Sequence, residues 1–308
     1  MGDAGQLYVA ADVIPVYKDL LPLATVITPN WFEVEYATSC PLCYKSPFSS
    51  TLNHRVLTDT QLKDLPSLHT ALRILHEQYH VPNVVISSIP LKPWLLAALP
   101  EHIKPDANSL DSTEYLLCIS SSSSHSSKDR LRPSIVHAQC VPLIPGYFSG
   151  VGDLFSALLL AHFHPSTSSK PGIDGISNLN DFPDTIWANT TTTDGIPTPL
   201  TTPSTPSLFP SSSSSSPSSL STTPLSAAAS LALHKTHSIL LLTHSSAQSL
   251  PYEERQPTDD ELDELEPLRR TRRMRGRELA LVKGHGIIRG DVKGQGRELV
   301  FWDGFWDL

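Results

Sequence analysis

The residues with the clearest potential for chemistry are a glycine turn and the carboxylate that follows it. Gly150, Val151, Gly152 and Asp153 open an apolar run at 154–163, which is typical of a buried helix. The backbone N–H groups at a helix start have no partner and carry the positive end of the helix dipole, so the three residues of the turn could hold an anion. Asp153 could act there as a general base, or it could serve only as a helix cap.

Two further acids, Asp3 and Glu33, lie at the ends of other predicted elements. Two of the three carboxylates could hold Mg²⁺, directly or through water, while the third accepts a proton from an alcohol that attacks a γ-phosphate. This division of labour is typical of a kinase. The same acids could equally be solvated surface groups, because spacing alone does not separate the two interpretations.

The elements that must position these groups alternate between strands and helices. Apolar, β-branched segments predict strands at 24–28, 81–88, 115–119, 135–144 and 278–283. Periodic apolar residues predict helices at 12–17 and beyond, at 58–79 and at 227–243. Asn30 and Glu33 have the spacing of a capping box, which predicts a helix from residue 31 onward.

This alternation predicts an α/β fold with a largely parallel central sheet flanked by helices. Ligands of such sheets gather beyond the carboxyl ends of the strands. Thr28, Asn30 and Glu33 follow one predicted strand, and Ser87 and Ser88 end the next. The glycine turn follows a fourth strand, so all of these groups are expected at the same edge.

Composition divides the chain into three parts, which we place at 1–163, 164–226 and 227–308. The third part is expected to hold a closing helix and strand followed by an irregular tail. Ser, Thr and Pro dominate the middle part. Its few apolar side chains cannot bury enough surface to offset the entropy lost on ordering the chain, so we predict a disordered insertion. The net charge of -8 argues against nucleic-acid binding. The basic run at 269–277 follows an acidic stretch at 259–266, which offsets much of its field.

Cys40 and Cys43 form the only close cysteine pair, and no second pair completes a zinc site, so we predict plain loop cysteines in a reducing compartment. The first ten residues do not have the pattern of a signal peptide, and the longest apolar run is far too short to span a membrane. We therefore expect a cytoplasmic protein without a membrane partner, and a nuclear location is also compatible with the sequence.

Six stretches, in this order and spacing, resemble pyridoxal kinases of the ribokinase-like superfamily. They are MGDAGQLYV at 1–9, residues 13–17 with the following LPLA, ITPNWFEVE at 27–35, VVISS at 84–88, GVGDLFSALLLAHF at 150–163 and the weaker REL-A-LV at 277–282. The resemblance covers roughly residues 1–163 and 227–283 and implies a ribokinase-like fold.

The resemblance also implies an activity, the transfer of the γ-phosphate of ATP to the 5'-hydroxymethyl group of pyridoxal, pyridoxine or pyridoxamine. Asp153 is then the general base, and Gly150, Val151 and Gly152 form the anion hole. Asp3 and Glu33 would act on Mg²⁺. The implied ATP-binding residues are Asp3, Thr28, Asn30, Glu33, Ser87, Ser88, Ile144, Pro145 and Gly146. A monovalent cation such as K⁺ and a homodimer are compatible with the family.

The sequence departs from the family pattern in three places. Val151 stands where pyridoxal kinases often have Thr, which removes a hydroxyl that could touch phosphate. The Ser/Pro-rich insertion interrupts the chain after residue 163. Met1 falls inside the family's D-P-V-x-G-D segment, so we expect the N-terminal half and much of the vitamer pocket to be absent. A catalytically inactive remnant that binds or dimerises with a partner, and a ribokinase-like kinase of another alcohol, therefore remain alternatives.

Overall fold

The computed structural model describes the parts of the chain that carry most of the predicted elements. The described residues are 2–3, 6–7, 10, 13–34, 58, 60–106, 110, 113–123, 132–164, 222–255, 265–290 and 298–307. They belong to one compact unit formed by Met1–Pro165 and Ser221–Leu308. Cys40, Cys43, the acids at 259–264 and nearly all of the Ser/Thr/Pro-rich part lie outside the described residues, so the predictions for them stay predictions.

The central sheet has four strands in the order β3-β4-β5-β6. Their bounds are β3 (Asn83–Pro90), β4 (Tyr115–Ser123), β5 (Ser134–Pro142) and β6 (Val300–Phe301). Each neighbouring pair is antiparallel. The α/β class predicted from the sequence is confirmed, but the expectation of a largely parallel sheet does not hold for these four strands. The short link between β4 and β5 suits an antiparallel pair, since parallel strands need a long crossover.

Parallel pairing among the described residues is limited to two isolated bridges, Ile27 with Val84 and Ser149 with Glu278. The strand predicted at 24–28 is therefore a single bridge beside β3. The strand predicted at 278–283 is wrong, because only Glu278 pairs and residues 281–284 form a turn.

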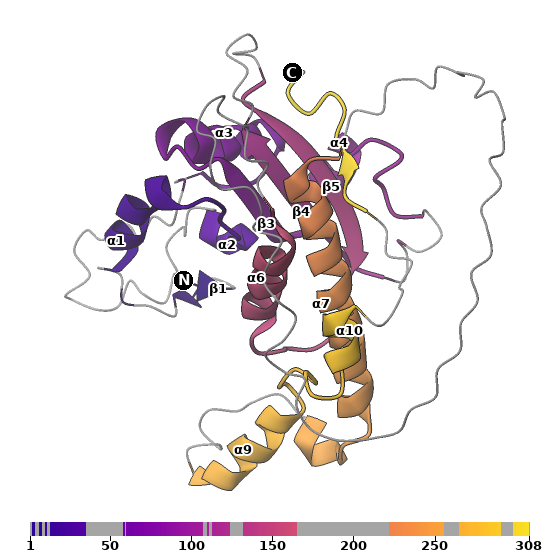
Figure 1. The fold of residues 1–308 in the computed structure, drawn as a ribbon. Coiled ribbons are helices and arrows are strands. Elements are labelled where there is room, and N and C mark those ends of the chain that lie inside the picture. The colour runs from indigo at the N-terminus through magenta and orange to yellow at the C-terminus, as the bar shows by residue number, and fades with distance from the viewer. Residues whose placement is uncertain are drawn as a thin grey trace, which may run out of the picture. The chain divides into compact units, whose positions relative to one another are not determined.

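Figure 1 shows some helices along the central sheet and others away from it. The helical elements are α1 (Val13–Leu20), η1 (Leu21–Leu23), α2 (Trp31–Val34), α3 (Leu65–Arg73), the π-helical η3 (Ile74–Gln78), α4 (Pro93–Ala98), α6 (Val151–His162), α7 (Pro224–Gln248), η4 (Tyr252–Arg255), α9 (Pro267–Arg275) and α10 (His285–Arg289). The short strands β1 (Gly2–Asp3) and β2 (Gln6–Leu7) form a separate antiparallel pair.

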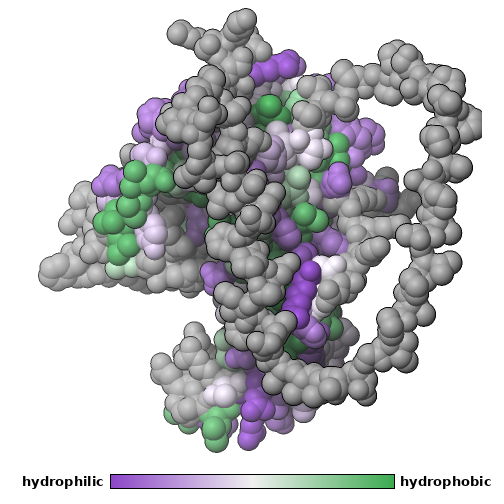
Figure 2. Space-filling view, in the orientation of Figure 1, coloured by the Kyte–Doolittle hydropathy of each residue, from purple (hydrophilic) through white to green (hydrophobic). Residues whose placement is uncertain are grey.

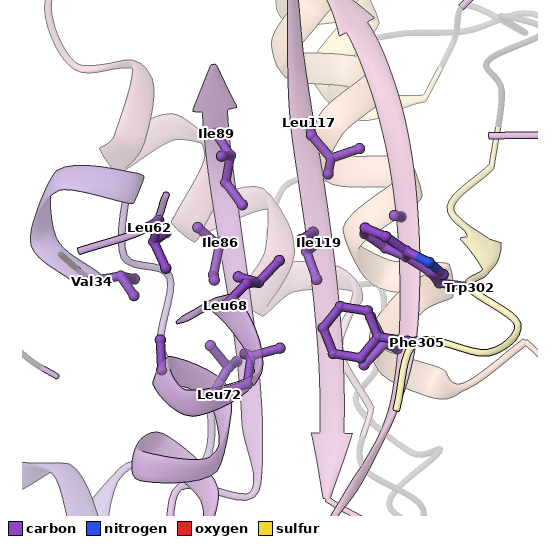
Figure 3. Packing of buried hydrophobic residues seen from close by; sticks show 14 of the residues in the cluster. Val34, Leu62, Leu68, Leu72, Ile86, Ile89, Leu117, Ile119, Trp302 and Phe305 are labelled. Carbon is purple, nitrogen blue, oxygen red and sulfur yellow. The ribbon is translucent and has the colours of Figure 1, made fainter. Parts of the chain in front are cut away.

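The sheet carries an apolar core on each face, because successive strand residues point to opposite sides. In β3, Val84 and Ile86 belong to the core that holds α3, α4 and the end of α2, whereas Val85 between them packs with α6 and α7. Residues of β4 alternate in the same way, with Leu117 and Ile119 on the first face. Figure 3 shows side chains of the first core converging between α3 and the strands. The result is a helix–sheet–helix sandwich.

The helix predicted at 58–79 begins later than expected, at Leu65. Asp64 accepts a hydrogen bond from the Ser67 backbone N–H at 2.9 Å, and the Ser67 hydroxyl accepts one from the Asp64 N–H at 3.1 Å. Pro66 fits the first turn because the N–H that it lacks would have no helical partner. The reciprocal cap therefore sets the start, and the apolar period alone does not mark it.

The C-terminal segment, which we expected to be irregular, supplies both an edge strand and core residues. Trp302 and Phe305 are buried in the first core, at an edge-to-face ring distance of 4.9 Å. Gly304 between them has a φ of 70°, which lets the chain turn so that both rings face inward. Aromatic burial explains why this tail is ordered against the sheet.

Several apolar side chains are exposed on α1 and on the turn after it. Val16, Leu20 and Leu23 are exposed, and apolar residues cover this region in Figure 2. Among the helices that the structure describes, none combines the length and the apolarity needed to cross a membrane.

Candidate functional site

The glycine turn before α6 leaves a helix start open. Gly150 is the N-cap residue and has the left-handed φ of 81°, a conformation that favours glycine. The first helical hydrogen bond runs from the Leu154 N–H to the Gly150 carbonyl at 3.0 Å. No acceptor among the described residues takes the N–H groups of Gly150, Val151, Gly152 or Asp153. These donors and the helix dipole make the turn a suitable site for an anion.

Asp153 is exposed in the first turn of this helix. Its carboxylate makes no hydrogen bond or ion pair with the residues that the structure describes. It does not act as the N-cap, because that position belongs to Gly150, where no side chain caps the helix. The cap interpretation of the sequence is therefore weakened, and the carboxylate is accessible to a ligand at the turn.

A chain of hydroxyl groups ties the glycine turn to the segment that precedes α2. The Ser156 hydroxyl donates to the Gly152 carbonyl at 2.8 Å, and the Thr28 hydroxyl lies 2.8 Å from the Ser156 oxygen. Since the single proton of Ser156 is used on Gly152, Thr28 is the donor of the second bond. The sequence prediction missed Ser156, although a lone hydroxyl one turn after Gly152 in an apolar helix was a signal.

Residues 27–29 run beside β3 and bring Thr28 to this place. The Ile27 carbonyl accepts from the Val85 N–H at 2.9 Å, and the Pro29 carbonyl accepts from the Ser87 N–H at 3.2 Å. Ser87 and Ser88 lie inside β3, where the register shifts between residues 86 and 89. The prediction placed them at a strand end, so the structure corrects their position. Both are half-buried.

The capping box predicted at Asn30 and Glu33 is confirmed. The Asn30 side-chain oxygen accepts from the Glu33 N–H at 2.9 Å, and a Glu33 carboxylate oxygen accepts from the Asn30 N–H at 3.1 Å. Both residues are half-buried at the start of α2. The Glu33 carboxylate therefore already has a structural role, which any role toward a metal must accommodate.

The remaining predicted residues lie at the margins of this region. Asp3 belongs to β1, which contacts α2. In the loop between β5 and α6, Ile144 is buried, while Pro145 and Gly146 are exposed. Gly146 has a φ of 119° and faces the Phe148 ring.

Among the predicted site residues, Thr28 is linked to the turn at 150–153 through Ser156. Asn30 and Glu33 bond to each other, and the Ser87 N–H bonds to the Pro29 carbonyl beside Thr28. Among the described side chains, no three His, Cys, Asp or Glu residues group as a metal site.

Tyr147 and Arg277 form a pair beside the glycine turn that the sequence analysis did not identify. The Arg277 carbonyl accepts from the Ser149 N–H at 3.0 Å, one residue before Gly150. The Arg277 guanidinium lies over the Tyr147 ring, 5.8 Å from its centre. Only their position in the tertiary structure reveals them, because Tyr147 and Arg277 are distant in sequence.

Comparisons with known proteins place these observations in a family context. No family model matches the chain. Two yeast proteins, each named "Putative pyridoxal kinase", are 31% identical over 176 residues in Schizosaccharomyces pombe and 32% identical over 179 residues in Saccharomyces cerevisiae. These matches cover 57% and 55% of this chain and 42% of each relative, so the chain spans less than half the length of these relatives.

Two further comparisons give the same family name. The pyridoxal kinase of Arabidopsis thaliana is 28% identical over 58% of this chain and 44% of its own length. Among solved structures, a pyridoxal kinase from Leishmania donovani in complex with ADP and pyridoxine has a TM-score of 0.49 at 18% identity, covering 98% of this chain and 59% of that one. The sequence matches show that more than half of this chain is similar to a part of these pyridoxal kinases.

Proposed function

We propose that this chain carries the phosphate-handling part of an ATP-dependent pyridoxal kinase, an enzyme of vitamin B6 salvage. The observation that carries the proposal is the link from Thr28 through Ser156 to Gly152, because it joins the two stretches that resemble the family most specifically. The open start of α6 and the exposed Asp153 carboxylate supply the donors and the base that phosphoryl transfer needs.

In the proposed reaction, Asp153 accepts the proton of the 5'-hydroxymethyl group of pyridoxal, pyridoxine or pyridoxamine. The alcohol oxygen attacks the γ-phosphorus of ATP, and the bond from that phosphorus to the bridging oxygen of ADP breaks. The N–H groups of Gly150, Val151 and Gly152 donate to the oxygens of the phosphoryl group in transit, where negative charge is spread. The products are the 5'-phosphate and ADP, and the proton leaves Asp153 to solvent.

Asp3 and Glu33 are the residues that we propose to hold Mg²⁺. Carboxylate oxygens are the ligands that this ion prefers, and water often completes its shell. An ion held there would neutralise part of the phosphate charge. Glu33 keeps its hydrogen bond to the Asn30 N–H, so it would act on the ion through water. The residues that would contact ATP are Thr28, Asn30, Ser87, Ser88 and the loop at 144–146.

The direct experiment incubates the purified chain with ATP, Mg²⁺ and pyridoxal and follows pyridoxal 5'-phosphate by chromatography. Calorimetric titration with ATP in the absence of pyridoxal measures nucleotide binding separately. We expect ATP binding that depends on Mg²⁺. Formation of product would show that the chain also holds the vitamer, whereas binding without product would support the nucleotide site alone. Pyridoxine, hydroxymethylpyrimidine and a sugar alcohol would then be assayed as acceptors.

The homodimer, the cytoplasmic or nuclear location and the monovalent cation K⁺ remain predictions. Sedimentation velocity of the chain over a range of concentrations tests the dimer. Comparing ATP turnover in potassium and tetramethylammonium salts tests the monovalent cation.

A further inference from the structure

The helix α1 and the turn after it carry an apolar face that this chain leaves uncovered. Of the residues in α1, only Ile14 is buried. Val16 and Leu20 are 56% and 51% exposed, and Leu23 in the turn is 80% exposed. Figure 2 shows apolar side chains gathered over this helix. A helix of about two turns is marginal in water unless packing covers its apolar face, so this surface is suited to a protein contact.

The segment after α1 leaves one edge of the sheet open. Ile27 uses both of its backbone groups on β3, donating to the Asn83 carbonyl at 3.0 Å and accepting from the Val85 N–H at 2.9 Å. Because successive peptide groups of an extended segment point to opposite sides, the backbone groups of Val26 and Thr28 point away from β3. Among the described residues, none bonds to these groups. Such an edge accepts another extended segment.

The charges of α1 indicate which partner fits. The helix has two charged residues, Lys18 and Asp19, which are adjacent and opposite in sign. Neither forms an ion pair or a hydrogen bond with the residues that the structure describes. In a twofold pair, each contact from residue i to residue j is matched by the reverse contact. Lys18 of each copy can therefore face Asp19 of the other, whereas an acidic or a basic partner would leave one of the two charges unpaired.

We propose that the open edge and the exposed face of α1 form a twofold interface between two copies of this chain. Only the short η1 and Ala24 separate the two surfaces in sequence. Antiparallel pairing centred on Ile27 places Val26 of one copy opposite Thr28 of the other, and each such pair exchanges two N–H···O bonds. The sheet then continues across the axis, and the apolar residues of α1 become covered. The inference rests on the predicted homodimer and not on the phosphate chemistry.

The test compares the self-association of two charge variants. In Lys18→Asp both charges of α1 are acidic, and in Asp19→Lys both are basic, so each variant repels its own copy. We expect the Kd of self-association to rise about tenfold in each variant, because the dimer contains every pair twice. An equal mixture of the two variants should form a heterodimer, and the double variant Lys18→Asp/Asp19→Lys should dimerise like the wild type. Sedimentation velocity measures the Kd, and native mass spectrometry identifies the mixed pair.

A second variant tests the apolar part of the interface. Leu23→Lys should raise the Kd about 10²-fold or more, because both copies lose apolar burial and gain a charge at the edge. Leu268→Lys is the matched control, since Leu268 lies on α9 and is 72% exposed. It should leave the Kd unchanged. Thermal unfolding of each variant at low concentration separates loss of the fold from loss of pairing.

The outcomes separate this interface from the other proposals. A dimer that forms equally well in the wild type, Lys18→Asp and Leu23→Lys would overturn the inference and leave the predicted homodimer to another surface. A wild-type chain that is monomeric at every concentration would overturn both. Open-ended aggregates would also overturn the inference, because a twofold interface closes at two copies. Absence of pyridoxal phosphorylation in a chain that forms this dimer would contradict the proposed kinase and not the interface.

Discussion

Thr28 and Ser156 are joined by a 2.8 Å hydrogen bond that crosses from the segment beside β3 to the first turns of α6. The bond holds together two sequence-distant stretches, one with the capping box at Asn30 and the other with the glycine turn. Because Ser156 also donates to Gly152, the position of the turn depends on the position of Thr28.

We expect this bond to be measurable by a double-mutant cycle. Thr28→Val keeps the shape of the side chain and removes the donor, while Ser156→Ala removes the acceptor. Each should lower the free energy of unfolding by about 1 kcal/mol, with a coupling of about 0.5–1.5 kcal/mol between them. Urea unfolding of the four proteins gives the coupling, and strictly additive losses would show that the bond does not form in solution.

The two glycines of the turn should respond differently to alanine. Gly150→Ala forces a side chain into a left-handed conformation and should cost about 1–2 kcal/mol of stability. A Cβ on Gly152 would meet no neighbouring side chain within 4 Å, so Gly152→Ala should keep or slightly raise the stability. If phosphate approaches the backbone at Gly152, the same variant should weaken ATP binding. Thermal unfolding and calorimetry measure the two effects, and unchanged ATP affinity would argue against a close approach there.

Asp153→Asn should lower kcat by at least about 10²-fold if the carboxylate is the general base. The fold should survive, since the side chain is exposed and makes no hydrogen bond or ion pair with the described residues. Asp303→Asn, which changes an exposed acid in the C-terminal turn, is the control for a loss of charge. Steady-state kinetics with ATP and pyridoxal test this, and near-normal turnover would leave Asp153 without a catalytic role.

Glu33 can be tested for its two roles separately. Glu33→Gln keeps an acceptor for the Asn30 N–H, because Gln also completes a capping box, so stability should change by less than about 0.5 kcal/mol. Asn30→Ala should cost about 1 kcal/mol. If Glu33 acts on Mg²⁺, its Gln variant should need more Mg²⁺ for half-maximal turnover. A magnesium titration identical to that of the wild type would limit Glu33 to the cap.

Stability should fall as the pH drops below about 6.5, the ordinary pKa of histidine. Burial lowers the pKa of His76, whose ring is hydrogen-bonded to the Val81 carbonyl and to Ser121. In the window between the lowered pKa and about 6.5, the unfolded chain binds more protons than the folded chain, so protonation favours unfolding. Burial likewise lowers the pKa of four other histidines: His69, His137, His162 and His237.

Urea unfolding between pH 5.5 and 7.5 measures this dependence. In His76→Gln, the loss of stability on acidification should be smaller than in the wild type, although the variant starts from a lower stability. A proton NMR titration that finds His76 charged above pH 6.5 in the folded chain would contradict the expectation.

Local signals in the sequence were sufficient for several elements. The three-residue spacing of Asn30 and Glu33 determined the cap of α2, because both bonds form within one turn. The β-branched segments determined the central parts of β3, β4 and β5, and the glycine turn with its apolar run determined α6. In these places the interactions that decide the structure lie between residues close in the chain.

Only the tertiary structure decided the direction of the strands, the single bridge at Glu278 and the burial of Trp302 and Phe305. These features depend on which distant segment offers a hydrogen-bonding edge or an apolar surface, and the residues next to each feature in the sequence do not specify that segment. The same holds for the site. The sequence alone pointed to Asp153 and the glycine turn, whereas the contacts of Ser156 with Thr28 and of Arg277 with Tyr147 exist because packing brings remote side chains within reach.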